Sequence, residues 1–309
     1  MRRDSEDKEY FIDNSRDLFE FLIEARQWTG FDINKLNRWI KNFEAIENGI
    51  YYACKILNRI IGYSESDITQ MLIEGIDKIM HQEAVLPLLV KKEFSALESE
   101  IDFCVQDALD NTLFAPLLVY DAPGESADAM MRLLTQKVKP PLKNKMFISN
   151  VPEDYSCRTL ILVDDCIGSG EQFIEFWESA QIRGGKLLRT WCKEKRIHPY
   201  YLCLVAYDET IKTLQKDYQD ITIVSIEEIT ERHSIFSIGN GVWDNEEELG
   251  LAIQQIQGLL ADKNINIYGY KNLGFGVILH NSIPDWSLPI LHKEKNGWKL
   301  LVERKDSND

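Results

Sequence analysis

The chain has 309 residues, of which 44% are hydrophobic and 28% are charged, and its formal net charge is −15. This composition is typical of a folded soluble protein, and the length suffices for one large domain or two modest ones. The acidic balance argues against non-specific binding of nucleic acid, because an acidic surface repels phosphate backbones. A small phosphorylated ligand held by backbone amides remains compatible with it.

The cysteines and the apolar runs bear on the compartment. The six cysteines show neither zinc spacing nor a dense disulfide pattern, which is typical of reduced thiols in a cytosolic protein. Residues 1–10 carry charges of both signs without an apolar signal core. The apolar runs 84–90 and 160–163 are too short to cross a bilayer. We therefore expect a cytoplasmic protein that does not contact membranes.

The first third of the chain is predicted to be helical. Apolar residues recur every three or four positions within 33–43 and within 68–79, which places them on one face of a helix. No strand signal precedes residue 113. Aromatic residues are frequent in this region and are common interface anchors, which leads to the hypothesis of a partner surface here. For each residue taken singly, the helical core is the favoured alternative. These aromatic residues are Trp28, Phe31, Trp39, Phe43, Tyr51 and Tyr52.

Beyond residue 113, short apolar runs alternate with amphipathic stretches. Strands are predicted at 115–120, 146–148, 160–163, 202–206, 221–224 and 276–279, and helices at 126–136, 171–180, 209–216 and 246–260. This alternation predicts an α/β fold, a parallel sheet with helices on both faces, in which ligands bind beyond the carboxyl ends of the strands. The chain is thus expected to comprise a helical N-terminal region (1–110), an α/β domain (111–303) and a polar tail (304–309).

The segment 160–172 is the most informative part of the sequence. Four apolar residues lead into Asp164 and Asp165, then into Gly168-Ser169-Gly170, and then into a helix. The strand should deliver both acids to the rim of the sheet, outside the core. The glycines let successive N–H groups point inward, and the helix adds its positive end, so that an anion cradle forms beside two carboxylates. The cradle suits a sugar phosphate, with the acids holding ribose hydroxyls or a hydrated Mg²⁺. Alternatively, the acids are caps or a metal site in an unrelated α/β fold.

This segment resembles the phosphoribosyl pyrophosphate motif of type I phosphoribosyltransferases. Asp164 and Asp165 match its acidic pair, Ser169 and Gly170 match its Thr-Gly, and Gly168 takes the preceding small position. The resemblance implies that both acids are catalytic and bind Mg²⁺, directly or through water. It also implies a substrate phosphate-binding loop, made of Cys166, Ile167, Gly168, Ser169, Gly170, Glu171 and Gln172. Gln172 departs from the pattern, because a second Thr is usual there.

The same resemblance implies two further groups of residues. An earlier pyrophosphate loop and a basic segment after it have as candidates Asp121, Gly124, Ser126, Lys143 and Lys145. A plain turn capped by Ser126 and solvated lysines are the alternatives. The acceptor pocket has as candidates His280, Asn281 and Asp285, which serve equally well as turn formers.

A more particular resemblance covers most of the chain. Trp39-x-x-Asn42-Phe43, the acidic loop and the segment 280–291 are together similar to the PRTase-CE group. That phosphoribosyltransferase-like family is tied to bacterial conflict systems, including retron cassettes. The resemblance implies an enzyme that binds phosphoribosyl pyrophosphate or a nucleotide with Mg²⁺, acts at ribose C1 and is a toxic effector in antiviral defence. It further implies a protein partner encoded nearby, such as a reverse transcriptase complex. The alternative is a non-catalytic ligand-sensing module, which Gln172 favours, whereas the paired acids and the lysines favour an enzyme.

Overall fold

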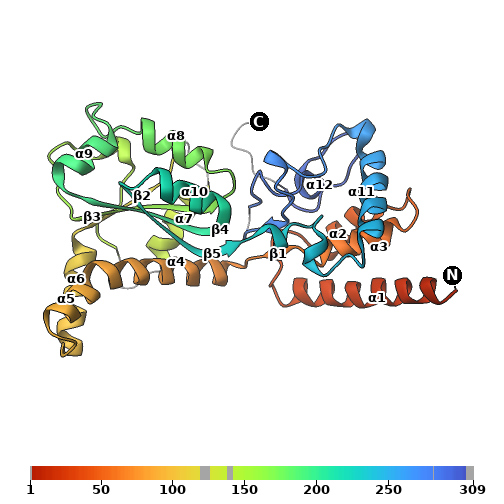
Figure 1. Ribbon diagram of the computed structural model, residues 1–309, viewed down its shortest axis with the longest axis horizontal. Helices are drawn as coiled ribbons and strands as arrows, with labels where there is room; N and C mark the ends of the chain where they lie inside the picture. Colours follow the sequence, from red (N-terminus) through yellow and green to blue (C-terminus); the bar gives the residue numbers. More distant parts are fainter. Residues whose placement is uncertain (1, 119–125, 138–141, 281, 304–309) are drawn as a thin grey trace. The chain divides into compact units, whose positions relative to one another are not determined.

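The computed structural model describes residues 2–118, 126–137, 142–280 and 282–303 (Figure 1). The chain divides into two compact units. Unit 1 combines Met1–Ile68 with Ile229–Asp306, and the body of unit 2 is Thr69–Glu228. Each unit has a hydrophobic core of its own, and each is described by itself.

Unit 2 is built on a sheet that has the strand order β2-β3-β4-β5 within the described residues. Its strands are β2 (Thr112–Pro116), β3 (Thr159–Ile167), β4 (His198–Tyr207) and β5 (Thr222–Ile229). β3 pairs in parallel with β2 on one side and with β4 on the other, with Val163 opposite both Pro116 and Leu202. β2 is buried along its whole length, and a nearly continuous apolar run of this kind is expected for a strand covered on both faces.

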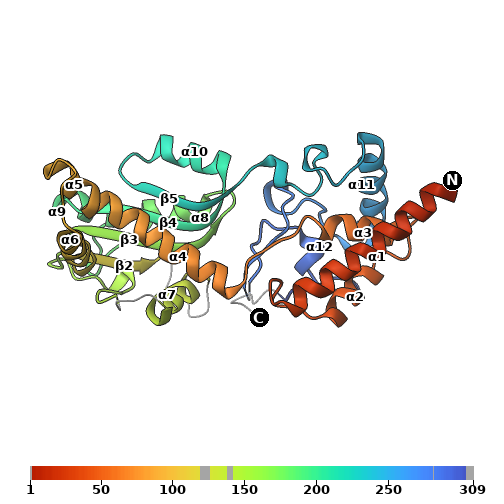
Figure 2. The ribbon, with the colours of Figure 1, turned by 90° about the horizontal axis from the view of Figure 1, so that it is seen from below.

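Helices cover both faces of this sheet, as the alternating sequence pattern predicts. Figures 1 and 2 show α8, α9 and α10 over one face, and α4 and α7 over the other. The aromatic residues Phe173, Phe176 and Trp177 of α8 pack on the strands in a single buried cluster. The helix α4 (Glu65–Met80) begins in unit 1 and continues into unit 2. The other helical segments of unit 2 are the π-helix η1 (His81–Val85), α5 (Leu86–Lys91), α6 (Glu98–Asp110), α7 (Ser126–Lys137), the 3-10 helix η2 (Ile148–Asn150), α8 (Glu171–Ser179), α9 (Leu188–Lys195) and α10 (Asp208–Asp217).

Unit 1 brings the two ends of the chain into one core. Trp39 and Trp298 both donate their indole N–H to the carbonyl of Ile290, at 2.6 and 2.9 Å. Its main elements are α1 (Arg2–Glu24), α2 (Ile33–Lys41), α3 (Gly49–Leu57), β1 (Ile61–Gly62), α11 (Glu246–Leu260), β6 (Val277–Ile278) and α12 (Pro289–His292). The short strands β1 and β6 pair in parallel. The short 3-10 helices η3 (Glu231–His233), η4 (Ile238–Asn240), η5 (Ala261–Lys263) and η6 (Tyr270–Asn272) connect these elements.

Three expectations about local structure require correction. A strand does occur before residue 113, because β1 pairs with β6; two residues are too few to show a periodicity. The segment 146–148 is not a strand: Lys145 makes only an isolated bridge to Phe114, and a 3-10 helix begins at Ile148. The six aromatic residues considered as surface anchors are all buried in the core of unit 1, so the core interpretation holds for them.

The compact units do not follow the expected division at residue 110. Residues 229–303, expected within the α/β domain, belong to unit 1 with the N-terminal helices, while α5 and α6 belong to unit 2. The helical character of the first third is nevertheless confirmed, apart from β1. Among the described helices, none combines the length and the apolar character that a membrane span requires.

Candidate functional site

The acidic pair lies inside β3 and not beyond its end. β3 continues to Ile167, and Asp164 sits opposite Cys203 of β4 in the parallel register. The exposed fractions of Asp164 and Asp165 are 2% and 5%. The expectation that both acids lie outside the core was therefore wrong, because the strand pairing extends further than the apolar run.

Burial determines the protonation behaviour of Asp164. The loss of solvent and, next, the charge of Asp165 raise the pKa of Asp164 well above its ordinary value. Two hydrogen bonds partly offset this effect: Tyr201 donates its hydroxyl to Oδ2 and the Asp165 N–H donates to Oδ1, both at 2.9 Å. The pKa of the neighbouring Cys166 thiol is also raised well above its usual range, by burial and by the two carboxylates. Cys166 is consequently a protonated thiol at neutral pH and is a poor nucleophile.

The turn between β3 and α8 has a fixed conformation. Gly170 adopts φ +79°, in the left-handed region that favours glycine. A Cβ atom at this position would also lie 2.9 Å from Cγ2 of Thr210 on α10. Thr210 donates its hydroxyl to the carbonyl of Gly168 at 2.6 Å, which ties the turn to α10. The Ser169 hydroxyl accepts a hydrogen bond from the N–H of Glu171, at 3.4 Å.

The turn leads directly into the N-terminus of α8. The N–H groups of the first turn of a helix have no partners within the helix and carry its partial positive charge, so they favour an anion. Glu171 and Gln172 are exposed at this end, whereas Phe173 is buried. The ring of Phe173 stacks on Tyr201, with the ring centroids 4.8 Å apart and the planes at 16°. Tyr201 also donates its hydroxyl to Asp164. The first turn of α8 and the acid are therefore linked through Tyr201.

Tyr201 and Thr210 were not predicted from the sequence as parts of the site. Tyr201 lies in a run of buried residues in β4, where its hydroxyl has no obvious purpose until the register with β3 is known. Thr210 lies in the first turn of α10, a position at which threonine is unremarkable. The available signal was a pair of tyrosines, Tyr200 and Tyr201, at the start of the buried stretch of β4, because a buried hydroxyl requires a hydrogen-bond partner.

The candidates for the pyrophosphate loop are only partly described. Asp121 and Gly124 lie outside the described residues, and Ser126 begins α7 without a described side chain. Lys143 forms an ion pair with Asp110, at 2.6 Å. Since Asp110 ends α6 just before β2 starts, Lys143 lies at the amino end of β2, whereas the turn after β3 lies at the carboxyl edge. Lys145 forms an isolated parallel β-bridge, through its backbone, with Phe114 of β2. The structure does not bring these two lysines to the phosphate loop.

Two of the acceptor-pocket candidates, His280 and Asp285, belong to unit 1, whereas the candidate phosphate loop belongs to unit 2. His280 contacts the Thr29 hydroxyl through Nδ1 at 3.2 Å and Glu65 through Nε2 at 3.6 Å. Asp285 is exposed, and Asn281 lies outside the described residues. The role of these residues in an acceptor pocket stays a prediction.

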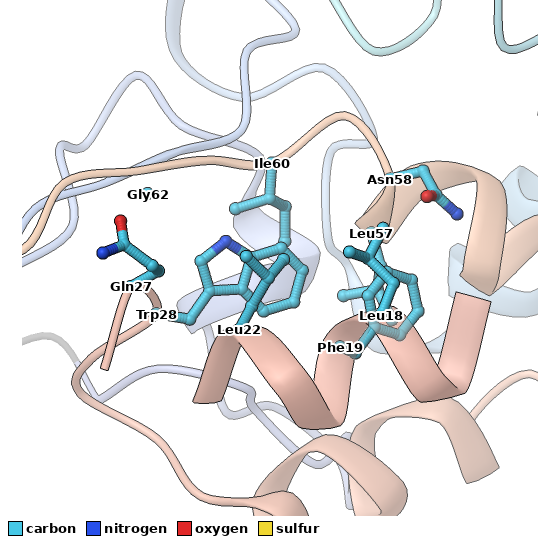
Figure 3. Close-up of a pocket in the computed structure, with 9 residues that line it drawn as sticks. All are labelled: Leu18, Phe19, Leu22, Gln27, Trp28, Leu57, Asn58, Ile60 and Gly62. Carbon is cyan, nitrogen blue, oxygen red and sulfur yellow. The ribbon is translucent and has the colours of Figure 1, made fainter. Parts of the chain in front are cut away.

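Unit 1 also contains a cavity of about 240 Å³ (Figure 3). Its lining is mainly apolar, and the amides of Gln27 and Asn58 are its polar side chains. The Asn58 amide is already engaged, since it donates to Ser15 and to the carbonyl of Cys54. The lining residues are Leu18, Phe19, Leu22, Gln27, Trp28, Leu57, Asn58, Ile60 and Gly62. None of these side chains is titratable, so the cavity offers no acid–base chemistry.

The family model of PRTase-CE matches residues 36–304. The chain belongs to the PRTase-CE family. The match spans residues 69–228 of unit 2, the part of unit 1 from residue 36 onward, and the whole acidic loop. No curated protein is similar enough to this PRTase-CE chain to count as a relative.

One solved structure with local similarity is the orotate phosphoribosyltransferase from Aeropyrum pernix. Its sequence is 17% identical, and the TM-score is 0.27. The similarity covers 40% of this chain and 62% of that enzyme, so less than two thirds of the enzyme is matched. Family membership therefore stands on the family model, and the α/β architecture stands on the sheet itself.

Proposed function

We propose that this PRTase-CE protein binds phosphoribosyl pyrophosphate, or a nucleotide that presents the same groups, and acts on the bond at ribose C1. The observation that carries the proposal is the tied turn Gly168–Gly170 between the acidic pair and the N-terminus of α8. In parallel α/β sheets, ligands bind at this edge, and sugar phosphates favour helix N-termini. The PRTase-CE family and the α/β fold agree with this chemistry.

Each part of the site would have a distinct task. The amides of the turn and the Ser169 hydroxyl would hold the ribose phosphate. The carboxylates of Asp164 and Asp165 would accept hydrogen bonds from ribose hydroxyls, which fixes the sugar relative to the turn. As pyrophosphate or a base leaves, positive charge develops on the sugar, and nearby carboxylates stabilise it.

Mg²⁺ is part of this proposal. No group of three or more His, Cys, Asp or Glu side chains that could hold a metal occurs among the described residues. Mg²⁺ usually takes only one or two carboxylates from a protein and completes its shell with water and substrate phosphates, so an acidic pair suits it. The pKa of Asp164 is raised by burial and, next, by the charge of Asp165, and a bound cation would offset both effects. Bound Mg²⁺ would neutralise the charge of the pyrophosphate group.

Two assays test this function. Calorimetry should detect binding of phosphoribosyl pyrophosphate to the intact chain, more tightly with Mg²⁺ than with a chelator. Release of pyrophosphate, measured by a coupled assay, then distinguishes an enzyme from a binder. Absence of binding with and without Mg²⁺ would refute the proposal.

The second candidate is a module that senses the same ligand without turnover. Two observations favour it: Gln172 replaces the usual second Thr of the motif, and Asp164 is buried with an elevated pKa. Binding without pyrophosphate release would select this candidate. The variant Gln172→Thr restores the missing hydroxyl, so pyrophosphate release by this variant and not by the parent would show that Gln172 accounts for the absence of turnover.

The wider role that we propose is that of a toxic effector in bacterial antiviral defence, held by a protein partner encoded nearby such as a reverse transcriptase complex. It rests on membership in PRTase-CE and on the tie between that group and bacterial conflict systems that the sequence resemblance implies. Expression of the chain without its genetic neighbours should slow bacterial growth, and Asp164→Asn with Asp165→Asn should restore it. Equal growth of cells that make the parent and cells that make the double variant would refute this role.

A further inference from the structure

Unit 2 carries a helical hairpin that exposes several of its large apolar side chains. We call α5, the turn after it and α6 up to Phe103 the 86–103 hairpin. Figures 1 and 2 show α5 beyond the end of α4, at one end of unit 2. Neither α5 nor α6, both of which lie wholly within the described residues, contains a single fully buried residue. The large hydrophobic residues that the hairpin exposes are Leu86 (44%), Val90 (61%), Phe94 (72%), Leu97 (66%) and Phe103 (74%).

These residues are concentrated in one short stretch of the chain, between positions 86 and 103. Leu86 and Val90 are four positions apart on one helix, so they share a face. Phe94 lies in the turn that follows, Leu97 directly precedes α6, and Phe103 lies on α6. Scattered exposed hydrophobic residues are ordinary, but several on one small supersecondary unit mark an interaction site.

The backbone of the turn gives an independent indication. Glu93 and Phe94 both adopt positive φ, at 50° and 62°, and the N–H of Phe94 donates to the carbonyl of Leu89 at 2.8 Å to close α5. Glycine or asparagine normally takes this position at the end of a helix, and a bulky residue with positive φ is strained. Strain of this kind gathers at functional sites. At Phe94 the strained backbone conformation occurs together with an aromatic side chain that is exposed to solvent.

Charge selects the kind of partner. The exposed acids Glu93, Glu98 and Asp102 lie among the apolar residues, and Lys92 is paired with Glu100 at 2.7 Å. Lys91 is the other lysine of the hairpin and is exposed, so acids outnumber lysines there. A symmetric contact between two copies of this chain would place these acids against each other, and the net charge of −15 also opposes self-association. A basic rim on a different protein would attract them.

We propose that the 86–103 hairpin is the docking site of another protein, one that presents an apolar groove bordered by lysine and arginine. Phe94 and Phe103 would enter the groove as anchors, since large aromatic side chains dominate binding energy at interfaces. The acids around them would set the orientation and speed the encounter.

The test uses the full chain in the cells that naturally make it. A photo-cross-linking amino acid replaces Phe103, and in a control chain it replaces Leu251 on α11, which is 46% exposed. The protein cross-linked at 103 and not at 251 is then purified, and its affinity for the chain is measured at low and high salt. We expect the double variant Phe94→Ser with Phe103→Ser to lose about ten-fold or more in affinity, and Leu251→Ser to lose none.

Each outcome of this test either supports or overturns the proposal. Affinity that falls with added salt and falls again in the double variant supports the proposal. The proposal is overturned by any of three results: no cross-linked protein, cross-linking to a second copy of the chain, or an affinity that is indifferent to both salt and the double variant. Thermal melting verifies that the double variant folds, which is expected because both side chains are exposed. Its binding of phosphoribosyl pyrophosphate should equal that of the parent, so a failure here is distinct from a failure of the proposed activity.

Discussion

At the scale of single residues, the site depends on a carboxyl group that is costly to charge. Asp164 is buried beside another carboxylate and is held by one tyrosine hydroxyl and one backbone N–H. A position optimised only for stability would not keep two acids there, because burying a charge is unfavourable without a compensating partner. The arrangement is consistent with a ligand that supplies hydroxyl groups or a cation.

The pH dependence of stability should reveal the raised pKa of Asp164. In the unfolded chain its pKa is near the ordinary value of about 3.9, and in the folded protein it is higher. The folded state therefore holds the proton more tightly, and stability falls as the pH rises from the unfolded pKa through the folded one. Asp164→Asn does not titrate and should lack this fall, so it should be more stable than the parent at neutral pH. Urea unfolding at a series of pH values measures this; a difference between parent and variant that is constant with pH would contradict it.

The hydroxyl of Tyr201 should matter for both stability and ligand binding. Tyr201→Phe keeps the stacking on Phe173 but removes the donor to Asp164, which should cost roughly 1–3 kcal/mol because a buried acceptor loses its partner. Tyr200→Phe is the matched control, since its hydroxyl donates to Glu83 instead, at 2.6 Å. Only Tyr201→Phe should weaken binding of phosphoribosyl pyrophosphate in calorimetry. Equal binding by the two variants would show that Tyr201 is structural.

At the scale of elements, the conformation of the turn after β3 is set by α10 as well as by its own glycines. Thr210 holds the Gly168 carbonyl and at the same time leaves no room for a side chain at residue 170. The turn, the N-terminus of α8 and the start of α10 therefore form one rigid arrangement. Preorganised amides of this kind bind an anion without a further ordering cost.

A pair of glycine variants tests this rigidity. Gly170→Ala and Gly184→Ala both place alanine at positive φ, +79° and +99°, which should cost each about 1–2 kcal/mol. Gly184 has open space around it, whereas a Cβ at 170 meets Thr210 at 2.9 Å, so Gly170→Ala should lose about another 1–3 kcal/mol from overpacking. Thermal melting compares the two. If they melt alike, the contact with α10 does not restrict the turn.

The elements also show where sequence patterns are informative. The helix predicted at 246–260 has those limits as α11, and the predicted strand 160–163 lies within β3, because periodicity and continuous apolar runs report burial directly. The extension of β3 through the two acids was missed, because aspartate is depleted in strands and only the pairing with β4 reveals it. The β1–β6 pair was missed because each strand has two residues.

At the scale of the whole molecule, local patterns do not determine which distant segments share a core. Trp39 reaches the carbonyl of Ile290, 251 positions along the chain, and the resulting unit combines the N-terminal helices with residues from 229 onward. The composition of either segment alone gives no indication of this pairing. The candidate anion loop could be proposed from the sequence because all its parts are contiguous between 160 and 172, whereas Tyr201 and Thr210, which contact it, come from other elements.

The central claim is that the acidic pair and the turn after it bind a phosphoribosyl group. The most direct test is calorimetry with phosphoribosyl pyrophosphate and Mg²⁺ on the parent and on the double variant Asp164→Asn with Asp165→Asn, each with its thermal melt. We expect the variant to melt at or above the temperature of the parent, because it loses a buried repulsion. Each lost hydrogen bond to a charged group costs on the order of 1.5–3 kcal/mol, so the affinity should fall by orders of magnitude. A variant that folds and binds the ligand as tightly as the parent would contradict the claim.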